Sequence, residues 1–337
     1  MKTRYNYPLR RHNTFGINTR AKRYISLDTA GEIYRLIMRE EALASKHLIL
    51  GGGSNILFTG DFEGTVIHPL FNKIRTIKTV GDNVLIAAEA GLEWDRLVEW
   101  AVDNDLGGLE NLSYIPGMVG AAPIQNIGAY GAEVSGLITA VHAVSLDNAR
   151  DRVFTAEECM FAYRDSIFKH ELKDKYLITK VDFSLKRSPV TFNLAYGNLE
   201  KEACCRGKIS LQGIREAVIK IRREKLPDPS VRGNAGSFFK NPVVSERKYT
   251  GMKRLYPDLP SWHAGPGQYK LAAAWLIEKA GWKGKRSGGA AVHDKHALVL
   301  VNTGKATGRE ILELSDMITT SVRERFGIRL AKEVNIV

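Results

Sequence analysis

The chain has 337 residues, enough for two or three domains with a sizeable core. Hydrophobic residues make up 44% and charged residues 26%, a globular balance that excludes an intrinsically disordered chain. No apolar run reaches the roughly 18–20 residues of a membrane span. The basic amino terminus also lacks the apolar stretch of a secretory signal. We therefore expect a cytoplasmic protein that does not enter the membrane.

The net charge of +12, from 49 basic and 37 acidic residues, implies an anionic partner. Nucleic acid and phosphorylated small molecules both satisfy that charge. The basic residues occur in scattered pairs, without zinc-finger spacing or an RNP-like aromatic motif, so nucleic acid is disfavoured. Three cysteines are too few for a disulfide framework, and we interpret the adjacent Cys204 and Cys205 as partly buried thiols.

The first half of the chain alternates short β-rich runs with turn-rich loops. Strands are expected at 47–50, 65–67, 83–87, 141–145 and 176–185. Apolar residues at three- and four-residue spacing predict helices over 31–44 and 92–104. This mixed order, without strict βαβ alternation, predicts an α+β fold.

The second half is more helical. One apolar stripe is formed by Leu211, Ile214, Val218 and Ile221. The prolines that follow Lys225 end this helix. A capping box at Thr307 and Glu310 begins another helix, whose predicted buried face is Ile311, Leu314, Ile318 and Val322. Residues 331–337 are expected to return as a strand to an earlier sheet, and turn-rich segments favour a domain break near 185–230.

Two loops are rich in glycine or other small residues. The first comprises Gly51, Gly52, Gly53, Ser54 and Asn55. Its backbone N–H groups could approach an anion closely, although a plain glycine turn is the alternative. It lacks the Lys-Ser/Thr pair of a P-loop, and the chain has no G-x-G-x-x-G, which disfavours a Rossmann site.

The second loop, residues 115–131, has no charged residue among its seventeen, and includes four glycines, three alanines and two prolines. Such a segment cannot form a normal helix or strand, and it suits a flat, bulky ligand. Gln125, Asn126 and Tyr130 could hydrogen-bond to that ligand or stack on it. A loop buried against its own domain is the alternative.

Outside these two loops, few residues suggest catalysis or ligand binding. Ser237 comes after Gly233 and Gly236 and precedes Phe238 and Phe239, which would shelter a proton-transferring hydroxyl; a tight turn capped by serine is the alternative. Arg164, followed by aspartate, by itself indicates only a surface ion pair. His293 and His296 precede an apolar run, where a strand would aim them to opposite faces, so we predict no metal site.

Six blocks of sequence carry a family resemblance over nearly the whole chain. They are residues 48–58, 108–134, 163–169, 225–244, 270–302 and 331–337. Together they resemble the longer, type I form of the UDP-N-acetylenolpyruvoylglucosamine reductase family.

The resemblance implies an α+β fold with a FAD-binding domain of the PCMH/vanillyl-alcohol-oxidase type over 17–187, in two subdomains of about 1–75 and 76–187. It places the type I insertion and a connecting helix at 188–226. It implies a C-terminal α+β substrate-binding domain at 227–328 and a returning tail at 329–337. A monomer is expected.

The implied reaction reduces UDP-N-acetylglucosamine enolpyruvate to UDP-N-acetylmuramate for peptidoglycan synthesis. NADPH would reduce a non-covalently bound FAD, and flavin N5 would then pass hydride to the enolpyruvyl group. The carbon bearing the carboxylate must gain a proton. By motif match, Ser237 donates that proton, while Arg164 and Glu333 polarise the carboxylate.

The resemblance also assigns ligand contacts. FAD would be held by Gly51, Gly52, Gly53, Ser54, Asn55, Ile115, Pro116, Gly117, Gly120, Ala121, Ala122, Gln125, Asn126, Ile127, Gly128, Ala129 and Tyr130. The UDP-sugar would be held by Tyr163, Tyr196, Lys225 and Asn241, with Lys225 supplying charge to the diphosphate.

Three departures affect this assignment. Ala121 and Ala122 replace common hydroxyl residues, residues 295–296 replace amides near the substrate, and Lys332 and Asn335 replace proline and arginine beside Glu333.

A flavin oxidase on the same scaffold and a basic nucleic-acid-binding protein are the other hypotheses. Three anionic ligands, FAD, NADPH and the UDP-sugar, account better for the charge than nucleic acid does.

Overall fold

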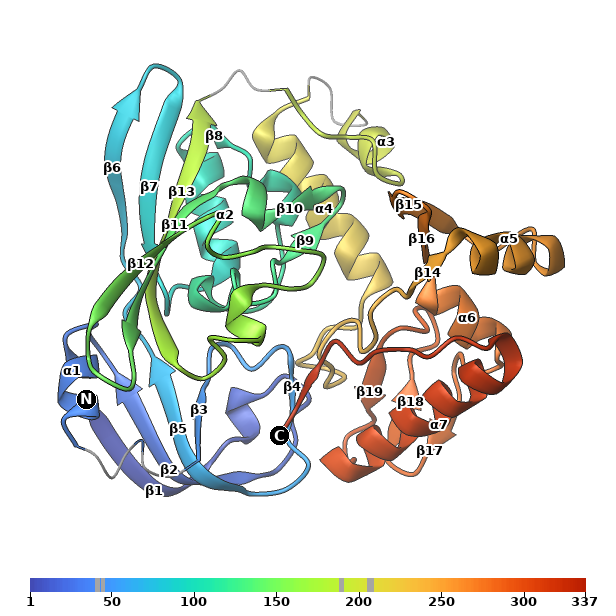
Figure 1. The fold of residues 1–337 in the computed structure, drawn as a ribbon, viewed down its shortest axis with the longest axis horizontal. Helices are drawn as coiled ribbons and strands as arrows, with labels where there is room; N and C mark the ends of the chain where they lie inside the picture. Colours follow the sequence, from blue (N-terminus) through green and yellow to red (C-terminus); the bar gives the residue numbers. More distant parts are fainter. Residues whose placement is uncertain (40–42, 44–45, 188–190, 205–208) are drawn as a thin grey trace. The chain divides into compact units, whose positions relative to one another are not determined.

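The computed structural model describes residues 1–39, 43, 46–187, 191–204 and 209–337, and the chain divides into two compact units (Figure 1). The first unit contains Met1–Tyr7, Ala21–Gly53 and Phe62–Glu224. The second contains Pro8–Arg20, Ser54–Asp61 and Lys225–Val337. The two short amino-terminal segments of the second unit had no signal in the sequence.

The first unit begins with a four-stranded sheet. Its strands, in spatial order, are β1 (Lys2–Pro8), β2 (Arg20–Leu27), β5 (Phe62–Pro69) and β3 (His47–Ile49), and β5 runs parallel to both β2 and β3. Helix α1 spans only Glu32–Ile37, so the helix predicted to begin at residue 31 is shorter than expected. Of its predicted continuation, residues 40–42 and 44 lie outside the described part of the chain.

A larger antiparallel sheet follows in the same unit. Its order is β12 (Asp151–Thr155), β11 (Ile138–Ser145), β13 (Tyr176–Arg187), β7 (Asn83–Glu89) and β6 (Ile74–Val80), with β8 (Leu106–Gly107) also paired to β13. Helix α2 (Trp94–Asp103) buries Trp94 against Phe183 of β13, at 6.1 Å between ring centroids. The predicted strands at 83–87, 141–145 and 176–185 and the helix at 92–104 are thereby confirmed within a few residues.

The rest of the first unit consists of short elements and two helices. A small hairpin pairs β9 (Gly128–Ala129) with β10 (Ala132–Glu133). Helices α3 (Leu199–Cys204) and α4 (Leu211–Lys225, whose last residue belongs to the second unit) share a small apolar cluster. The predicted stripe on α4 is confirmed, because all four of its residues are buried. The single-turn 3-10 helices lie at Glu110–Leu112, Val119–Ala121, Val134–Gly136 and Ile167–Lys169.

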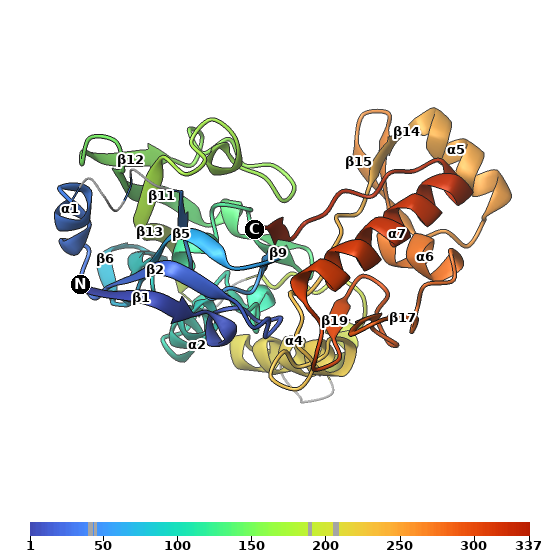
Figure 2. The same ribbon diagram turned by 90° about the horizontal axis from the view of Figure 1, so that it is seen from below.

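The second unit contains small sheets and three helices, of which α7 packs beside α6 (Figure 2). One sheet has the order β14 (Val243–Ser245), β16 (Gln268–Leu271) and β15 (Ser261–Gly265), and another has β17 (Arg286–Ser287), β18 (Ala290–Val292) and β19 (Leu300–Asn302). The helices are α5 (Glu246–Leu255), α6 (Ala273–Lys279) and α7 (Gly308–Phe326), and a 3-10 turn covers Arg10–His12.

The predicted capping box at the start of α7 is confirmed, whereas the predicted returning strand is confirmed only over two residues, which pair with one other strand in a separate two-stranded sheet. Glu310 N–H donates to Thr307 Oγ1 at 3.2 Å, and Thr307 N–H donates to Glu310 Oε2 at 2.7 Å, which completes the capping box of α7. The returning strand is only β20 (Asn335–Ile336), which pairs in parallel with β4 (Ile56–Leu57).

The structure does not support the interpretation of Cys204 and Cys205 as two partly buried thiols. Cys204 is exposed, and Cys205 lies outside the described residues. Cys159 is buried in the core of the first unit, and this burial raises its pKa to about 12. Within the described ranges, no helix combines the length and apolar character needed to cross a bilayer.

We expect Thr307→Ala to lower the free energy of unfolding by about 1 kcal/mol, because the first turn of α7 loses its side-chain cap. Urea unfolding followed by circular dichroism measures this difference. Thr320→Ala is the matched control, since Thr320 is exposed on the same helix. An equal loss in the two variants would contradict a specific role for the cap.

Candidate functional site

The glycine loop (residues 51–55) follows β3 and, within the first unit, lies against the beginning of the neutral loop (residues 115–131). A Cβ atom on Gly52 would lie 3.1 Å from Gly117 Cα, and one on Gly51 would lie 3.4 Å from Met118 Cγ. Gly53 and Gly117 have φ angles of +63° and +131°, which glycine adopts without strain. Two backbone segments therefore meet here without intervening side chains, as a pyrophosphate-binding backbone requires.

The neutral loop is anchored to the sheet of its own unit. Gly120 N–H donates to the carbonyl of Ala90 at 2.9 Å, and a Cβ on Gly120 would lie 2.6 Å from Ala90 Cβ. Val119, Ala122 and Ile127 are buried, whereas Gln125 and Tyr130 are half-buried. The loop thus packs partly on its own domain, as the alternative interpretation held, and also presents a partly exposed uncharged face.

Asn126 holds the neutral loop together from inside. It has a φ of +44°, its amide nitrogen donates to Glu133 Oε2 at 2.9 Å and to the Ala162 carbonyl at 3.1 Å, and its oxygen accepts from Ser135 N–H. Its side chain is therefore engaged in shaping the loop.

The sequence indicated a surface ion pair between Arg164 and Asp165, but the contacts of Arg164 are different. Its Nη2 donates to the Gly128 carbonyl at 2.6 Å, and its Nη1 lies 3.4 Å from the Asn126 carbonyl oxygen. The guanidinium also lies over the Tyr163 ring, 5.4 Å from the centroid. Asp165 instead pairs with His170 at 2.8 Å. The structure thus brings Arg164 and Tyr163 to the neutral loop.

Tyr196 also reaches this loop. Its ring meets that of Tyr130 edge-on at a centroid distance of 5.8 Å, and burial raises the pKa of Tyr130. The first unit therefore brings together Gly51 to Gly53, the neutral loop, Tyr163, Arg164 and Tyr196.

In the second unit, Ser237 lies on a short extended segment with a neighbour on each side. Ser237 pairs with Val299, and Phe239 pairs with Lys332. Glu333 N–H donates to the Phe238 carbonyl at 2.8 Å, which places the Glu333 backbone beside the residue that follows Ser237. Ser237 is half-buried, and both phenylalanines are fully buried.

The carboxyl-terminal tail also holds the end of the glycine loop that belongs to this unit. Asn55 Nδ2 donates to the Glu333 carbonyl at 3.3 Å, and Asn335 Nδ2 donates to the Asn55 carbonyl at 3.0 Å. The Asn55 side chain therefore binds the Glu333 backbone, and that backbone in turn binds Phe238, the residue after Ser237. Asn241 lies farther along, where its Oδ1 accepts from Ala273 N–H at 2.9 Å and caps α6.

His293 and His296 occupy a turn between β18 and β19, so the prediction of a strand that aims them to opposite faces is wrong. His293 N–H donates to the Val299 carbonyl, and Val299 N–H donates to the His296 carbonyl. Among the described residues, neither Nδ1 atom has a hydrogen-bond partner, and both atoms are buried. Burial, followed by the positive charges of His293 and Lys225, lowers the pKa of His296. The described ranges contain no group of three potential metal-ligating side chains.

Three residues at Tyr114, which precedes the neutral loop, had no individual signal in the sequence: Asp95, Arg215 and Arg222. Asp95 and Arg215 form an ion pair in the first unit, and Arg222 donates to the Tyr114 carbonyl. The only hint was the basic pair Arg222-Arg223 on α4.

Comparisons with known proteins point to one family along both parts of the chain. Residues 22–148 match the family model described as FAD binding domain. Residues 228–337 match the model for the C-terminal domain of UDP-N-acetylenolpyruvoylglucosamine reductase. The solved structure of this reductase from Thermus caldophilus shares the fold, with a TM-score of 0.68, 24% identity, and coverage of 99% of this chain and 98% of that one.

Curated relatives carry the same name. The UDP-N-acetylenolpyruvoylglucosamine reductase of Flavobacterium johnsoniae is 42% identical, and that of Porphyromonas gingivalis is 44% identical, each over 100% of both chains. With this identity over the whole length of both chains, the protein belongs to the UDP-N-acetylenolpyruvoylglucosamine reductase family, whose FAD-binding and C-terminal domains it contains.

Proposed function

We propose that this chain catalyses the NADPH-dependent reduction of UDP-N-acetylglucosamine enolpyruvate to UDP-N-acetylmuramate, a step of peptidoglycan precursor synthesis. The observation that carries the proposal is the full-length identity of 42–44% to the reductases. The motif residues Ser237, Arg164 and Glu333 are all present.

The site suits a non-covalent FAD. The closely packed backbones of the glycine and neutral loops leave no space for side chains between Gly52 and Gly117. N–H groups of Gly51 to Gly53, with Ser54 and Asn55, would hold the pyrophosphate, and the uncharged face of the neutral loop would lie along the isoalloxazine. When bound, FAD accepts electrons from NADPH and supplies hydride from N5 to the enolpyruvyl group.

Ser237 donates the proton that completes the reduction. Hydride addition to the terminal alkene carbon leaves negative charge on the carbon that bears the carboxylate, and the Ser237 hydroxyl protonates that carbon. Serine is a weak acid in water, so its half-buried position beside two buried phenylalanines supports this role. Arg164, whose guanidinium is fixed by loop carbonyls, and Glu333 polarise the carboxylate as charge develops on it.

The substrate's diphosphate binds Lys225 at the end of α4, and Tyr163, Tyr196 and the amide nitrogen of Asn241 complete the sugar-nucleotide contacts. Asn241 Oδ1 is engaged at α6, so its nitrogen is the group left to donate. We place the reaction in the cytoplasm and in a monomer, since one chain carries both the FAD and the substrate parts. The free thiols Cys159 and Cys204 suit a reducing compartment.

We expect Ser237→Ala to retain flavin reduction by NADPH while slowing reoxidation by the UDP-sugar by roughly 10²–10⁴-fold, the contribution of a positioned acid. Anaerobic stopped-flow absorbance at the flavin band measures the two half-reactions separately. Equal loss in both would sink the assignment of Ser237. Flavin that bleaches with NADPH and recovers only in air would instead identify an oxidase.

Gly120→Ala tests the neutral loop. The added methyl would meet Ala90 Cβ at 2.6 Å, so the loop must shift. We expect the apoprotein to lose about 1–3 kcal/mol of stability and FAD to be retained less tightly after gel filtration. Gly136→Ala is the control, because a Cβ there would have no neighbour within 4 Å. Unchanged FAD retention in Gly120→Ala would contradict the loop's role.

A further inference from the structure

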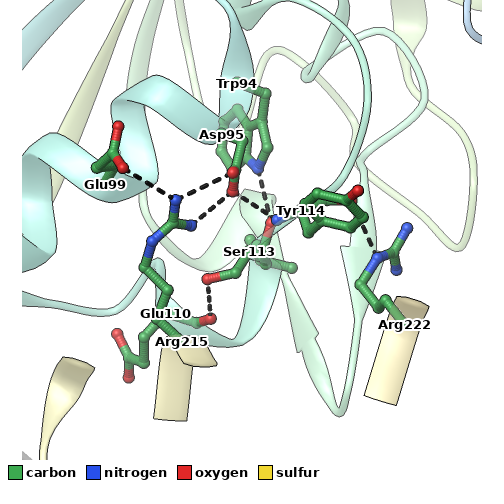
Figure 3. A network of polar contacts seen from close by, with 9 residues as sticks. Trp94, Asp95, Glu99, Glu110, Ser113, Tyr114, Arg215 and Arg222 are labelled. Atoms are coloured by element: carbon green, nitrogen blue, oxygen red, sulfur yellow. Dashed lines mark hydrogen bonds and ion pairs between the residues drawn. The ribbon is translucent and has the colours of Figure 1, made fainter. Parts of the chain in front are cut away.

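The backbone conformation of Tyr114, the residue before the neutral loop, is unusual. Its φ is +59°, a region that bulky residues rarely adopt. Both polar groups of its backbone are held by charged side chains (Figure 3). Its N–H donates to Asp95 Oδ1 at 2.5 Å, and its carbonyl accepts from Arg222 Nε at 3.0 Å. The strained residue is therefore fixed from two sides.

Asp95 is itself held rigidly. Arg215 donates to both carboxylate oxygens, with Nη1 2.6 Å from Oδ1 and Nη2 3.0 Å from Oδ2. Glu99 lies 3.7 Å from the same guanidinium. The Arg215 side chain is only 8% exposed. A bidentate pair of this kind fixes orientation as well as distance, so the oxygen that receives the Tyr114 N–H cannot turn away.

The two arginines act from one helix. Arg215 and Arg222 are seven residues apart on α4, which is two helical turns, and so lie on the same face. Arg223 adds its guanidinium over the Tyr114 ring, 5.1 Å from the centroid. Three residues of the apolar stripe, Ile214, Val218 and Ile221, anchor α4 separately in the cluster with Leu199 and Ala203.

The far end of the neutral loop is also held in the first unit. Asn111 Nδ2 donates to the Tyr130 carbonyl at 2.9 Å, and Asn193 Nδ2 donates to the Gly131 carbonyl at 3.1 Å. Burial raises the pKa of the Tyr130 phenol, and the positive charge of Arg222 acts in the opposite direction. The loop between them contributes no charge of its own.

We propose that Asp95, Arg215 and Arg222 are positioning residues that hold Tyr114 in its left-handed conformation and thereby set the neutral loop against the flavin. None of the three needs to touch FAD. Their effect passes through the Tyr114 peptide groups to the residues that follow. The proposal rests on FAD binding at this loop, and it does not depend on the identity of the reduced substrate.

Arg222→Met is the first test, because methionine keeps much of the apolar length but cannot donate to Tyr114. We expect the Kd for FAD to rise about tenfold or more, since a hydrogen bond from a charged group contributes on that order. We also expect a shifted absorption spectrum for the flavin that remains bound. Kd comes from the fluorescence change when FAD is titrated into apoprotein. Asp95→Asn is the second variant and should act in the same direction.

A second-site change separates positioning from general loss of folding. Asparagine tolerates positive φ better than tyrosine does. Tyr114→Asn, added to Arg222→Met, should therefore restore part of the lost FAD affinity. The control is Lys220→Gln, which removes an exposed cation from the same helix and breaks its surface ion pair with Glu202. Its FAD affinity should match that of the unmodified protein.

Several outcomes would overturn the proposal. Unchanged FAD affinity and spectrum in both Arg222→Met and Asp95→Asn would do so. So would affinity lost in Arg222→Met and not recovered at all with Tyr114→Asn. Weaker binding of UDP in calorimetry with normal FAD binding would identify Arg222 as a nucleotide ligand instead. If the unmodified protein binds FAD but does not reduce the UDP-sugar, the proposed function fails while the positioning role is still measured.

Discussion

The neutral loop must be rigid, although its own residues offer little to make it so. It has no charged side chain, and glycine and alanine supply seven of its seventeen residues. Asn126 holds it from inside, and its other fixed points come from outside. Ala90 packs against Gly120, Arg164 binds the Gly128 carbonyl, and the Asp95–Arg215 pair holds the residue before the loop. The charges stay at the loop's edges, so the surface of the loop is uncharged while its backbone is held by hydrogen bonds.

The sequence motifs were informative where the chemistry is local. The glycine loop, the neutral loop and the Ser237 segment are each one continuous stretch of sequence. The composition of each stretch alone therefore indicates what kind of surface it makes. The Asp95–Arg215 pair joins residues 120 positions apart, and no periodicity or spacing connects them. The extent of α1 was likewise overestimated, because the apolar spacing continues beyond Ile37 while the helix does not. Capping chemistry located the start of α7, since a capping box is read within four residues.

Two residues around Glu333 depart from the family pattern, yet the backbone there is still held by hydrogen bonds and an ion pair. Lys332, in place of an expected proline, pairs with Asp316 at 2.6 Å, and Asn335, in place of an expected arginine, donates to the Asn55 carbonyl. Glu333 keeps its backbone hydrogen bond to Phe238. At the neutral loop, Ala122 packs in the core, so the missing hydroxyl there is replaced by apolar burial. Polar contacts of the Ala121-Ala122 pair with FAD would therefore depend on the backbone.

The replacement of expected amides at residues 295–296 has a chemical logic for His296. A lowered pKa means that the imidazole stays neutral down to a lower pH than an exposed histidine would. Burial and the charges of His293 and Lys225 thus act together against protonation. A neutral imidazole has one donor and one acceptor, as an amide side chain has both kinds of group. His296 therefore keeps the hydrogen-bonding character of an amide near Lys225 without adding a second positive charge.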